Sequence, residues 1–190
     1  MKLSAITTNM QNAVIAIEDQ RFYEHNGIDI RGIMRAMAEN IKTMSFSQGA
    51  STLTQQVLKN EVLEREKSIS RKIKAQYLAV SLENALKKQL GSKDAAQKYI
   101  LELYLNTIPL HHGLRSVEAA AQYYYGKHAG ELTLAEAASI AGITKTPSLY
   151  APDVNQEASK ERQMTVLKKM LDLNMITQAE YDEAAAEDIY

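Results

Sequence analysis

Polar side chains that can bind a charged, oxygen-rich ligand are concentrated between Gly49 and Asn60. The segment combines hydroxyls, paired amides and a cation, contributed by Ser51, Thr52, Thr54, Gln55, Gln56, Lys59 and Asn60. Hydroxyls and amides donate hydrogen bonds and lysine supplies a full charge, so this set suits an anionic ligand such as a sugar phosphate. The structural alternative is a helix start in which the Ser51 side chain caps the amide of Thr54.

A pair of carboxylates, Glu18 and Asp19, lies where the first predicted helix ends. The apolar residues before the pair follow helical spacing, which places both carboxylates near the helix C-terminus. The helix dipole disfavours a negative charge there, so a carboxylate beside apolar neighbours becomes a better proton acceptor. We therefore assign Glu18 as a candidate general base. For Asp19 we favour the structural alternative, an ion pair with Arg21 or Arg35.

Both segments match motifs of one enzyme family. Residues 18–27 fit the pattern Glu-Asp-x-x-Phe-x-x-His-x-Gly, and residues 49–60 fit Gly-x-Ser-Thr-(Ile/Leu)-Thr-Gln-Gln-x-x-Lys-Asn. Two further motifs are present in residues 100–127 and 132–152. Because these motifs occur in order over most of the chain, the sequence closely resembles the peptidoglycan glycosyltransferases of glycosyltransferase family 51.

The resemblance implies a polymerase of lipid II, in which the 4-hydroxyl of one sugar displaces a polyprenyl pyrophosphate from the anomeric carbon of another. Because pyrophosphate leaves readily once its charge is neutralised, the reaction needs one base together with cations and hydrogen-bond donors. Glu18 would be the base, and a single in-line displacement would invert the donor sugar to give a β-1,4-linked glycan. The substrate-binding residues would be Ser51, Thr52, Gln55, Gln56, Lys59, Asn60, Lys67, Arg71 and Lys72.

One motif position departs from the family. The third motif, Arg-Lys-x-x-Glu, is present as Arg-Lys-Ile-Lys-Ala at 71–75, so Ala75 replaces its glutamate. The resemblance implies that this glutamate lies in the active-site cleft and either assists catalysis or orients donor-site groups, and we therefore expect the activity to be reduced. The neighbouring Gln76 would face about 100° away on a helix, and Glu83 lies two turns further on.

Two other function classes stay open. The alanine at position 75 favours a catalytically silent module that binds lipid II or glycan, whereas the intact Glu18 and Lys59 disfavour it. A lysozyme-like hydrolase is disfavoured because hydrolysis of a glycosidic bond needs a general acid for a poor sugar leaving group. The cation-rich region 59–72 is better suited to a diphosphate.

No spacing of ligands in the sequence requires a metal. The chain has no cysteine, which excludes a thiolate site, and the adjacent His111 and His112 are expected to point to different sides of their element. Several family members are stimulated by divalent cations, so Mg²⁺ or Mn²⁺ stays open as a cofactor. The resemblance implies that the partners are lipid II, the nascent glycan strand, the membrane surface and moenomycin-type inhibitors. No nucleic-acid partner is expected.

The elements that position these residues are predicted to be almost all helical. Apolar residues recur at helical spacing, and no segment alternates with the period of a strand between hairpin turns. Helices are predicted near 9–19, 29–43, 51–60, 68–89, 94–106, 115–125, 134–144, 155–173 and 178–186. Two of them open with capping-box patterns, which begin at Thr133 and Thr177. The resemblance implies an all-α fold with a lysozyme-like helical lobe and a smaller membrane-proximal lobe.

The length of 190 residues and the net charge of -1 fit one globular domain. No run of about eighteen apolar residues is present, although family members are normally anchored by an N-terminal membrane helix. We therefore interpret residues 1–190 as a glycosyltransferase domain excised from a longer, membrane-anchored chain. The expected location is the outer face of the bacterial cytoplasmic membrane.

Overall fold

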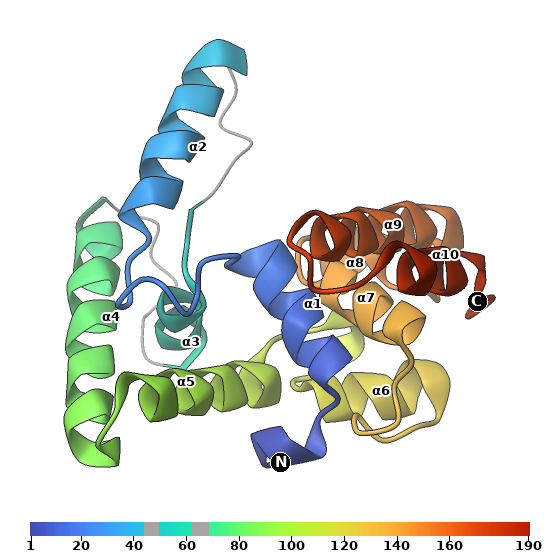
Figure 1. The fold of residues 1–190 in the computed structure, drawn as a ribbon, viewed down its shortest axis with the longest axis horizontal. Helices are drawn as coiled ribbons and strands as arrows, with labels where there is room; N and C mark the ends of the chain where they lie inside the picture. Colours follow the sequence, from blue (N-terminus) through green and yellow to red (C-terminus); the bar gives the residue numbers. More distant parts are fainter. Residues whose placement is uncertain (44–49, 62–68) are drawn as a thin grey trace. The chain divides into compact units, whose positions relative to one another are not determined.

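The computed structural model describes residues 1–43, 50–61 and 69–190, and these residues contain helices and no strands (Figure 1). The α-helices are α1 (Thr8–Glu18), α2 (Ile30–Thr43), α3 (Leu53–Glu61), α4 (Ile69–Leu90), α5 (Lys93–Thr107), α6 (Val117–Tyr125), α7 (Leu134–Ile143), α8 (Pro147–Tyr150), α9 (Gln156–Asp172) and α10 (Gln178–Ala186). Two short 3-10 helices, η1 and η2, span Leu3–Ala5 and His111–Gly113. The predicted all-α fold class is confirmed, and every predicted helix is present.

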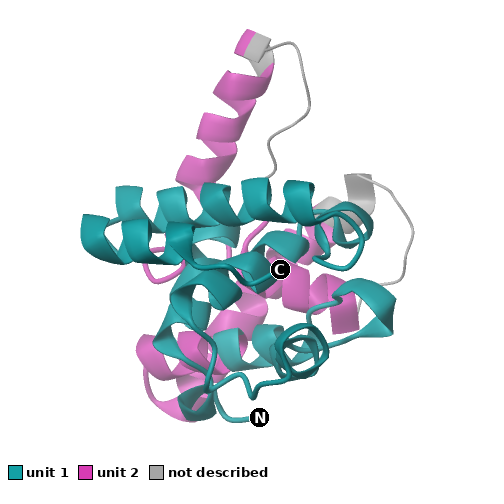
Figure 2. Ribbon diagram, turned by 90° about the vertical axis from the view of Figure 1, so that its right-hand side faces the viewer, with its two compact units in different colours: residues 1–20, 101–190 teal, residues 21–100 magenta. Residues whose placement is uncertain are grey.

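The chain divides into two compact units (Figure 2). Unit 1 contains Met1–Gln20 and Leu101–Tyr190, and the smaller unit 2 contains Arg21–Ile100. The boundary falls within α5. This division agrees with the larger and smaller lobes that the sequence predicts.

In unit 1 the apolar helix α7 is covered by its neighbours. Every residue from Ala135 to Ile143 is buried, and α7 packs against α1, α6, α8, α9 and α10. A helix that is apolar on all sides must be enclosed in this way, because each buried Ile or Leu side chain contributes about 1.5–3 kcal/mol. The small residues of α7 allow close packing: a Cβ on Gly142 would lie 2.9 Å from Cγ of Arg162.

Two helices of unit 1 begin with the predicted capping boxes. The Thr133 hydroxyl accepts a hydrogen bond from the Glu136 amide, and the Glu136 carboxylate accepts one from the Thr133 amide at 2.9 Å. Thr177 and Glu180 make the same pair of bonds at the start of α10. These boxes fix where α7 and α10 begin and satisfy amides that have no partner within the helix.

Unit 2 joins three segments that carry sequence motifs. The Thr52 hydroxyl, which precedes α3, donates to the Gly27 carbonyl at 2.7 Å. Gly27 has a φ of 84°, and a Cβ there would lie 2.7 Å from the carbonyl carbon and oxygen of Ala79 on α4. Glycine is therefore required at this position both for its backbone angle and for the close approach of α4. Gln97 on α5 holds the same loop by donating to the Phe22 carbonyl at 2.7 Å.

The amphipathic helix α2 of unit 2 exposes large apolar side chains. Figure 1 shows α2 extending away from α3 and α4 of the same unit. Ile30, Met34 and Met37 are 67%, 67% and 60% exposed, and they are four and three residues apart, which places them on one face. Among the described residues, no helix is long and apolar enough to cross a membrane.

Candidate active-site residues

Glu18 is the last residue of α1 in unit 1, as predicted. The helix begins at a Thr7 cap, whose side chain accepts from the Met10 amide, and ends at Asp19, where the backbone leaves the helical region with φ -155° and ψ 68°. Buried side chains on the inner face of α1 hold the helix against α7 and α9. The Glu18 side chain is half-buried and accepts a hydrogen bond from the Thr144 hydroxyl at 2.5 Å.

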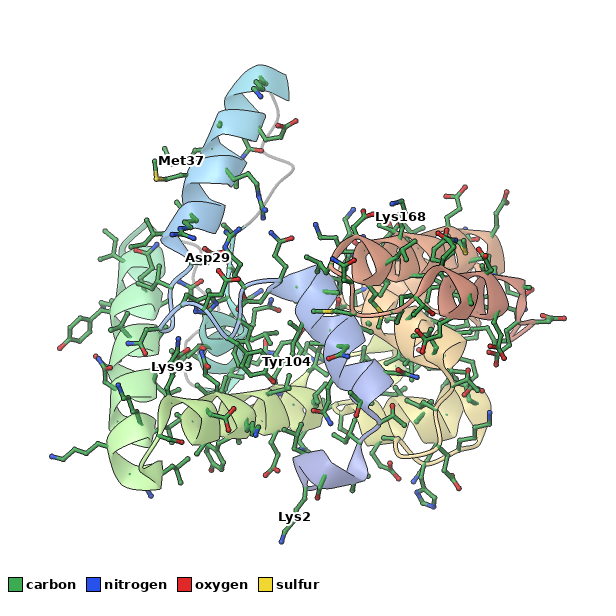
Figure 3. The ribbon with its side chains drawn as sticks, viewed as in Figure 1. Lys2, Asp29, Met37, Lys93, Tyr104 and Lys168 are labelled. Atoms are coloured by element: carbon green, nitrogen blue, oxygen red, sulfur yellow. The ribbon has the colours of Figure 1, made fainter. Side chains whose placement is uncertain are left out.

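Two further side chains of unit 1 lie within electrostatic range of Glu18. Burial lowers the pKa of Arg162 on α9, and the negative charge of Glu18 acts in the opposite direction. The Arg162 guanidinium also lies over the Tyr150 ring, 5.8 Å from the ring centroid. Burial raises the pKa of Tyr104 on α5 well above its usual value, and the charge of Glu18 adds to the increase. Tyr104 is fully buried and is labelled in Figure 3.

The sequence reasoning missed Thr144 and Arg162 as neighbours of Glu18. They are 126 and 144 residues away along the chain, so no local spacing connects them to the first motif. Tyr104 falls within the motif at residues 100–127, which is a local signal for its involvement. The contacts arise from the packing of α1 against α7 and α9.

The polar segment before and within α3 belongs to unit 2. About half of its polar side chains make hydrogen bonds inside the fold. Thr52 is buried and is the residue before the helix. Its amide donates to the Gln55 side chain at 2.9 Å, and its hydroxyl accepts from the Gln55 amide at 3.3 Å. This reciprocal pair is a capping box. The structural alternative of a capped helix start is therefore correct, but the capping residue is Thr52 and not Ser51, because Thr52 is followed by a glutamine three positions later.

Thr54 provides the second structural contact of this segment. Its buried hydroxyl donates to the buried carboxylate of Glu83 on α4 at 2.6 Å. Val57 and Leu58 are buried on the same helix. These contacts fix α3 on α4 and decide which of its faces remains accessible.

The accessible part of the segment is smaller than the motif. Ser51 and Lys59 are exposed, and Gln55, Gln56 and Asn60 are half-buried. Lys59 and Asn60 lie three and four residues after Gln56, so all three share one face of α3. That face presents amides and one cation, which is the chemistry expected of a phosphate-binding surface.

Three of the predicted cations are not placed by the structure. Lys67 and the motif residue Gly49 lie outside the described residues. Arg71 and Lys72 belong to α4, but their side chains lie outside the described part. Ala75 is half-buried on α4, while Glu83 points inward to Thr54.

The adjacent histidines differ from expectation. His112 has a left-handed backbone with φ 57°, which turns its ring to within 4.1 Å of the His111 ring centroid. We expected the two side chains to point apart, as they do in regular elements. His112 Nε2 lies 2.6 Å from Oδ2 of Asp153. Within the described residues, no group of three or more His, Cys, Asp or Glu residues could hold a metal ion.

Comparison with known proteins gives a consistent result. The family model described as Transglycosylase matches residues 1–171. Penicillin-binding protein 1A of Neisseria lactamica is 46% identical over 181 residues, which cover 95% of this chain and 22% of that protein. Penicillin-binding protein 1A of Vibrio cholerae serotype O1 is 45% identical over 189 residues, which cover 100% of this chain and 22% of that protein.

A solved structure of penicillin-binding protein 1A from Haemophilus influenzae also matches, with 44% identity and a TM-score of 0.48. The match covers 57% of this chain and 16% of that one. The chain thus spans about a fifth of the length of the curated relatives, 22% in the first two.

Proposed function

Because this chain belongs to the transglycosylase family, we propose that it is a peptidoglycan glycosyltransferase domain that polymerises lipid II. The observation that carries the proposal is Glu18, the carboxylate of a complete first motif, held in a defined orientation by Thr144. A second complete motif supplies the amides and the cation on the accessible face of α3.

In the proposed reaction Glu18 accepts the proton of the 4-hydroxyl of one sugar. The freed oxygen forms a bond to the anomeric carbon of the donor, and the bond from that carbon to the pyrophosphate oxygen breaks. Polyprenyl pyrophosphate leaves with the electron pair, and the donor sugar is inverted. Lys59, Gln56 and Asn60 bind the diphosphate and stabilise the charge that develops on it.

The polyprenyl tail of the substrate is expected to stay in the bilayer, which requires the domain to lie at the membrane surface. The exposed residues Ile30, Met34 and Met37 of α2 support such a contact. Exposed Arg31 and Arg35 lie on the same helix. An exposed apolar face with cations beside it is the composition of helices that lie in the membrane interface. We propose that this surface faces the outer leaflet of the cytoplasmic membrane.

The alanine at position 75 supports reduced activity as part of the proposal. Glu83 lies two turns further along α4, where its buried carboxylate accepts a hydrogen bond from Thr54. It therefore does not take the place of the missing carboxylate. A module that binds lipid II without polymerising it is therefore the second candidate, and Ala75 is the observation that favours it.

The test is incubation of the protein with lipid II, followed by separation of polymer from monomer. Polymer formed by the wild type and absent with Glu18→Gln supports the proposal. Binding of lipid II and moenomycin without polymer identifies the silent module instead. Parallel reactions with Mg²⁺, Mn²⁺ or a chelator determine whether a divalent cation contributes.

A further inference from the structure

Thr144 follows the last residue of α7 and has two hydrogen-bond acceptors within reach. Its Oγ1 lies 2.5 Å from Oε1 of Glu18 and 2.8 Å from the backbone carbonyl of Ala141. A threonine hydroxyl carries one proton, so it donates to one of these acceptors at a time. The choice between them depends on the charge of Glu18.

Which of the two acceptors is the stronger depends on whether Glu18 is ionised or protonated. An ionised carboxylate is the stronger acceptor, because hydrogen bonds to charged groups are stronger than those between neutral groups. A protonated carboxyl group loses this advantage. The Ala141 carbonyl lies in the last turn of α7, where carbonyl oxygens need partners from outside the helix.

We propose that Thr144 is a positioning residue that holds Glu18 while its carboxylate is ionised and releases it when the carboxyl group is protonated. With Glu18 ionised, the hydroxyl donates to Oε1 and fixes the carboxylate, so that the proton of the acceptor sugar arrives on Oε2. After that transfer the Thr144 proton rotates to the Ala141 carbonyl and stays on its own oxygen. No proton is gained or lost by Thr144 in the cycle. The inference rests on the proposed function, in which Glu18 is the base.

Other charged or titratable groups lie near Glu18 within unit 1. Arg162 approaches from α9, Tyr104 from α5, and Asp19 is the next residue on the chain. Arg162 and Tyr104 interact with Glu18 through charge, and their effects persist when a nearby hydroxyl is removed. The Thr144 contribution is distinguished by its short, directional contact.

Three variants separate the hydroxyl from the rest of the side chain. Thr144→Val keeps the shape and removes the donor, and Thr144→Ser keeps the donor. Thr107→Val is the matched control, because Thr107 in unit 1 also donates to a helix carbonyl, that of Leu103 at 2.8 Å. Thr107 has no part in the proposed site.

The first measurement follows the Glu18 carboxyl carbon by NMR during a pH titration, with Glu18→Gln used to assign its signal. Thr144→Val is expected to raise the midpoint by about one pH unit, or about tenfold in proton affinity, because the ionised form loses a donor. Thr144→Ser and Thr107→Val are expected to titrate like the wild type. This measurement requires no substrate.

The second measurement is lipid II polymerisation as a function of pH. Thr144→Val is expected to lower kcat about tenfold with little change in KM, and to move the acidic limb of the rate profile to higher pH. Serine at this position is expected to restore both quantities. A purely structural role would not produce this rescue together with the shifted limb.

Unchanged titration and unchanged kcat in Thr144→Val would overturn the proposal, and so would a serine variant that behaves like the valine variant. A shifted titration in a protein whose wild type forms no polymer would support the Thr144 hydrogen bond and reject the proposed function. The two conclusions can therefore fail separately.

Discussion

The end of α1 and the segment that begins α3 carry the two most complete motifs, and they use their polar residues differently. Glu18 projects from a buried helix and is held by a hydroxyl from a residue 126 positions away. In the α3 segment, Thr52 and Thr54 turn inward and bind Gly27 and Glu83. A threonine thus binds a glutamate in both regions: the glutamate is half-buried at the end of α1, where we propose the chemistry, and buried beneath α3, where the pair serves assembly.

The comparison also explains why the second motif is long. Its first half caps α3 and attaches it to the loop of the first motif and to α4, and its second half presents Gln56, Lys59 and Asn60. A ligand surface on a short helix needs such attachment, because a helix of this length is marginal in isolation. The structural residues therefore position the residues of the proposed ligand surface.

The largest expected effect is at Glu18. The change Glu18→Gln keeps the shape of the side chain and the oxygen that accepts from Thr144, but the amide cannot take up the acceptor proton. We expect polymerisation to fall about a hundredfold or more. The rate is measured with lipid II, and the helical content by circular dichroism. Near-normal turnover by a folded variant would remove Glu18 from the mechanism.

The second change tests the structural half of the α3 segment. Thr54→Val removes the hydroxyl donor from the buried Glu83 carboxylate, and we expect the free energy of unfolding to fall by about 1–3 kcal/mol. Ser51→Ala, at an exposed position, is expected to change it by less than about 0.5 kcal/mol. Urea denaturation of the two variants gives the comparison. Equal stabilities would mean that Thr54 does not attach α3 to α4.

The sequence predicts the positions of the long helices better than it predicts the short helix α8 and the capping residue of α3. Helix positions were predicted to within a few residues, because apolar spacing and capping residues are local signals. The four-residue helix α8 was missed, since Pro147 at its start gives a turn signal as readily as a helix start. The structural alternative for the start of α3 names Ser51 as the cap, whereas the Thr52-x-x-Gln55 pattern in the sequence marks the residue that caps the helix.

The surroundings of Glu18 could not be predicted. The proposed base, Glu18, belongs to a motif of ten residues, but its hydrogen-bond partner depends on how α1 packs against α7 and α9. No pattern of neighbouring residues around Thr144 or Arg162 suggests a role in catalysis. Tertiary contacts of this kind connect residues whose separation along the chain carries no signal.

The third change tests the ligand-facing half of the segment. Lys59→Ala is expected to weaken binding of lipid II and of moenomycin about tenfold, because a charge-assisted contact to phosphate is lost. Lys74→Ala is the matched control, since Lys74 is another exposed lysine of unit 2 and lies outside the proposed surface. Both affinities are obtained by titration. Equal losses in the two variants would indicate a general charge effect and no specific diphosphate site.

The smallest expected effect is a gain at position 75. Ala75→Glu restores the carboxylate of the third motif, and the half-buried helix position accepts glutamate at little cost relative to alanine. The new carboxylate would lie one turn after Arg71 in α4, and an ion pair at this spacing contributes about 0.2–0.5 kcal/mol. An arginine oriented in this way would bind the donor phosphates more effectively, and we expect the polymerisation rate to rise roughly twofold. The rates of both proteins are compared at matched concentration, after confirming that each is folded and binds moenomycin. An unchanged rate would show that the missing carboxylate is compensated elsewhere, so that one carboxylate, Glu18, suffices for this domain.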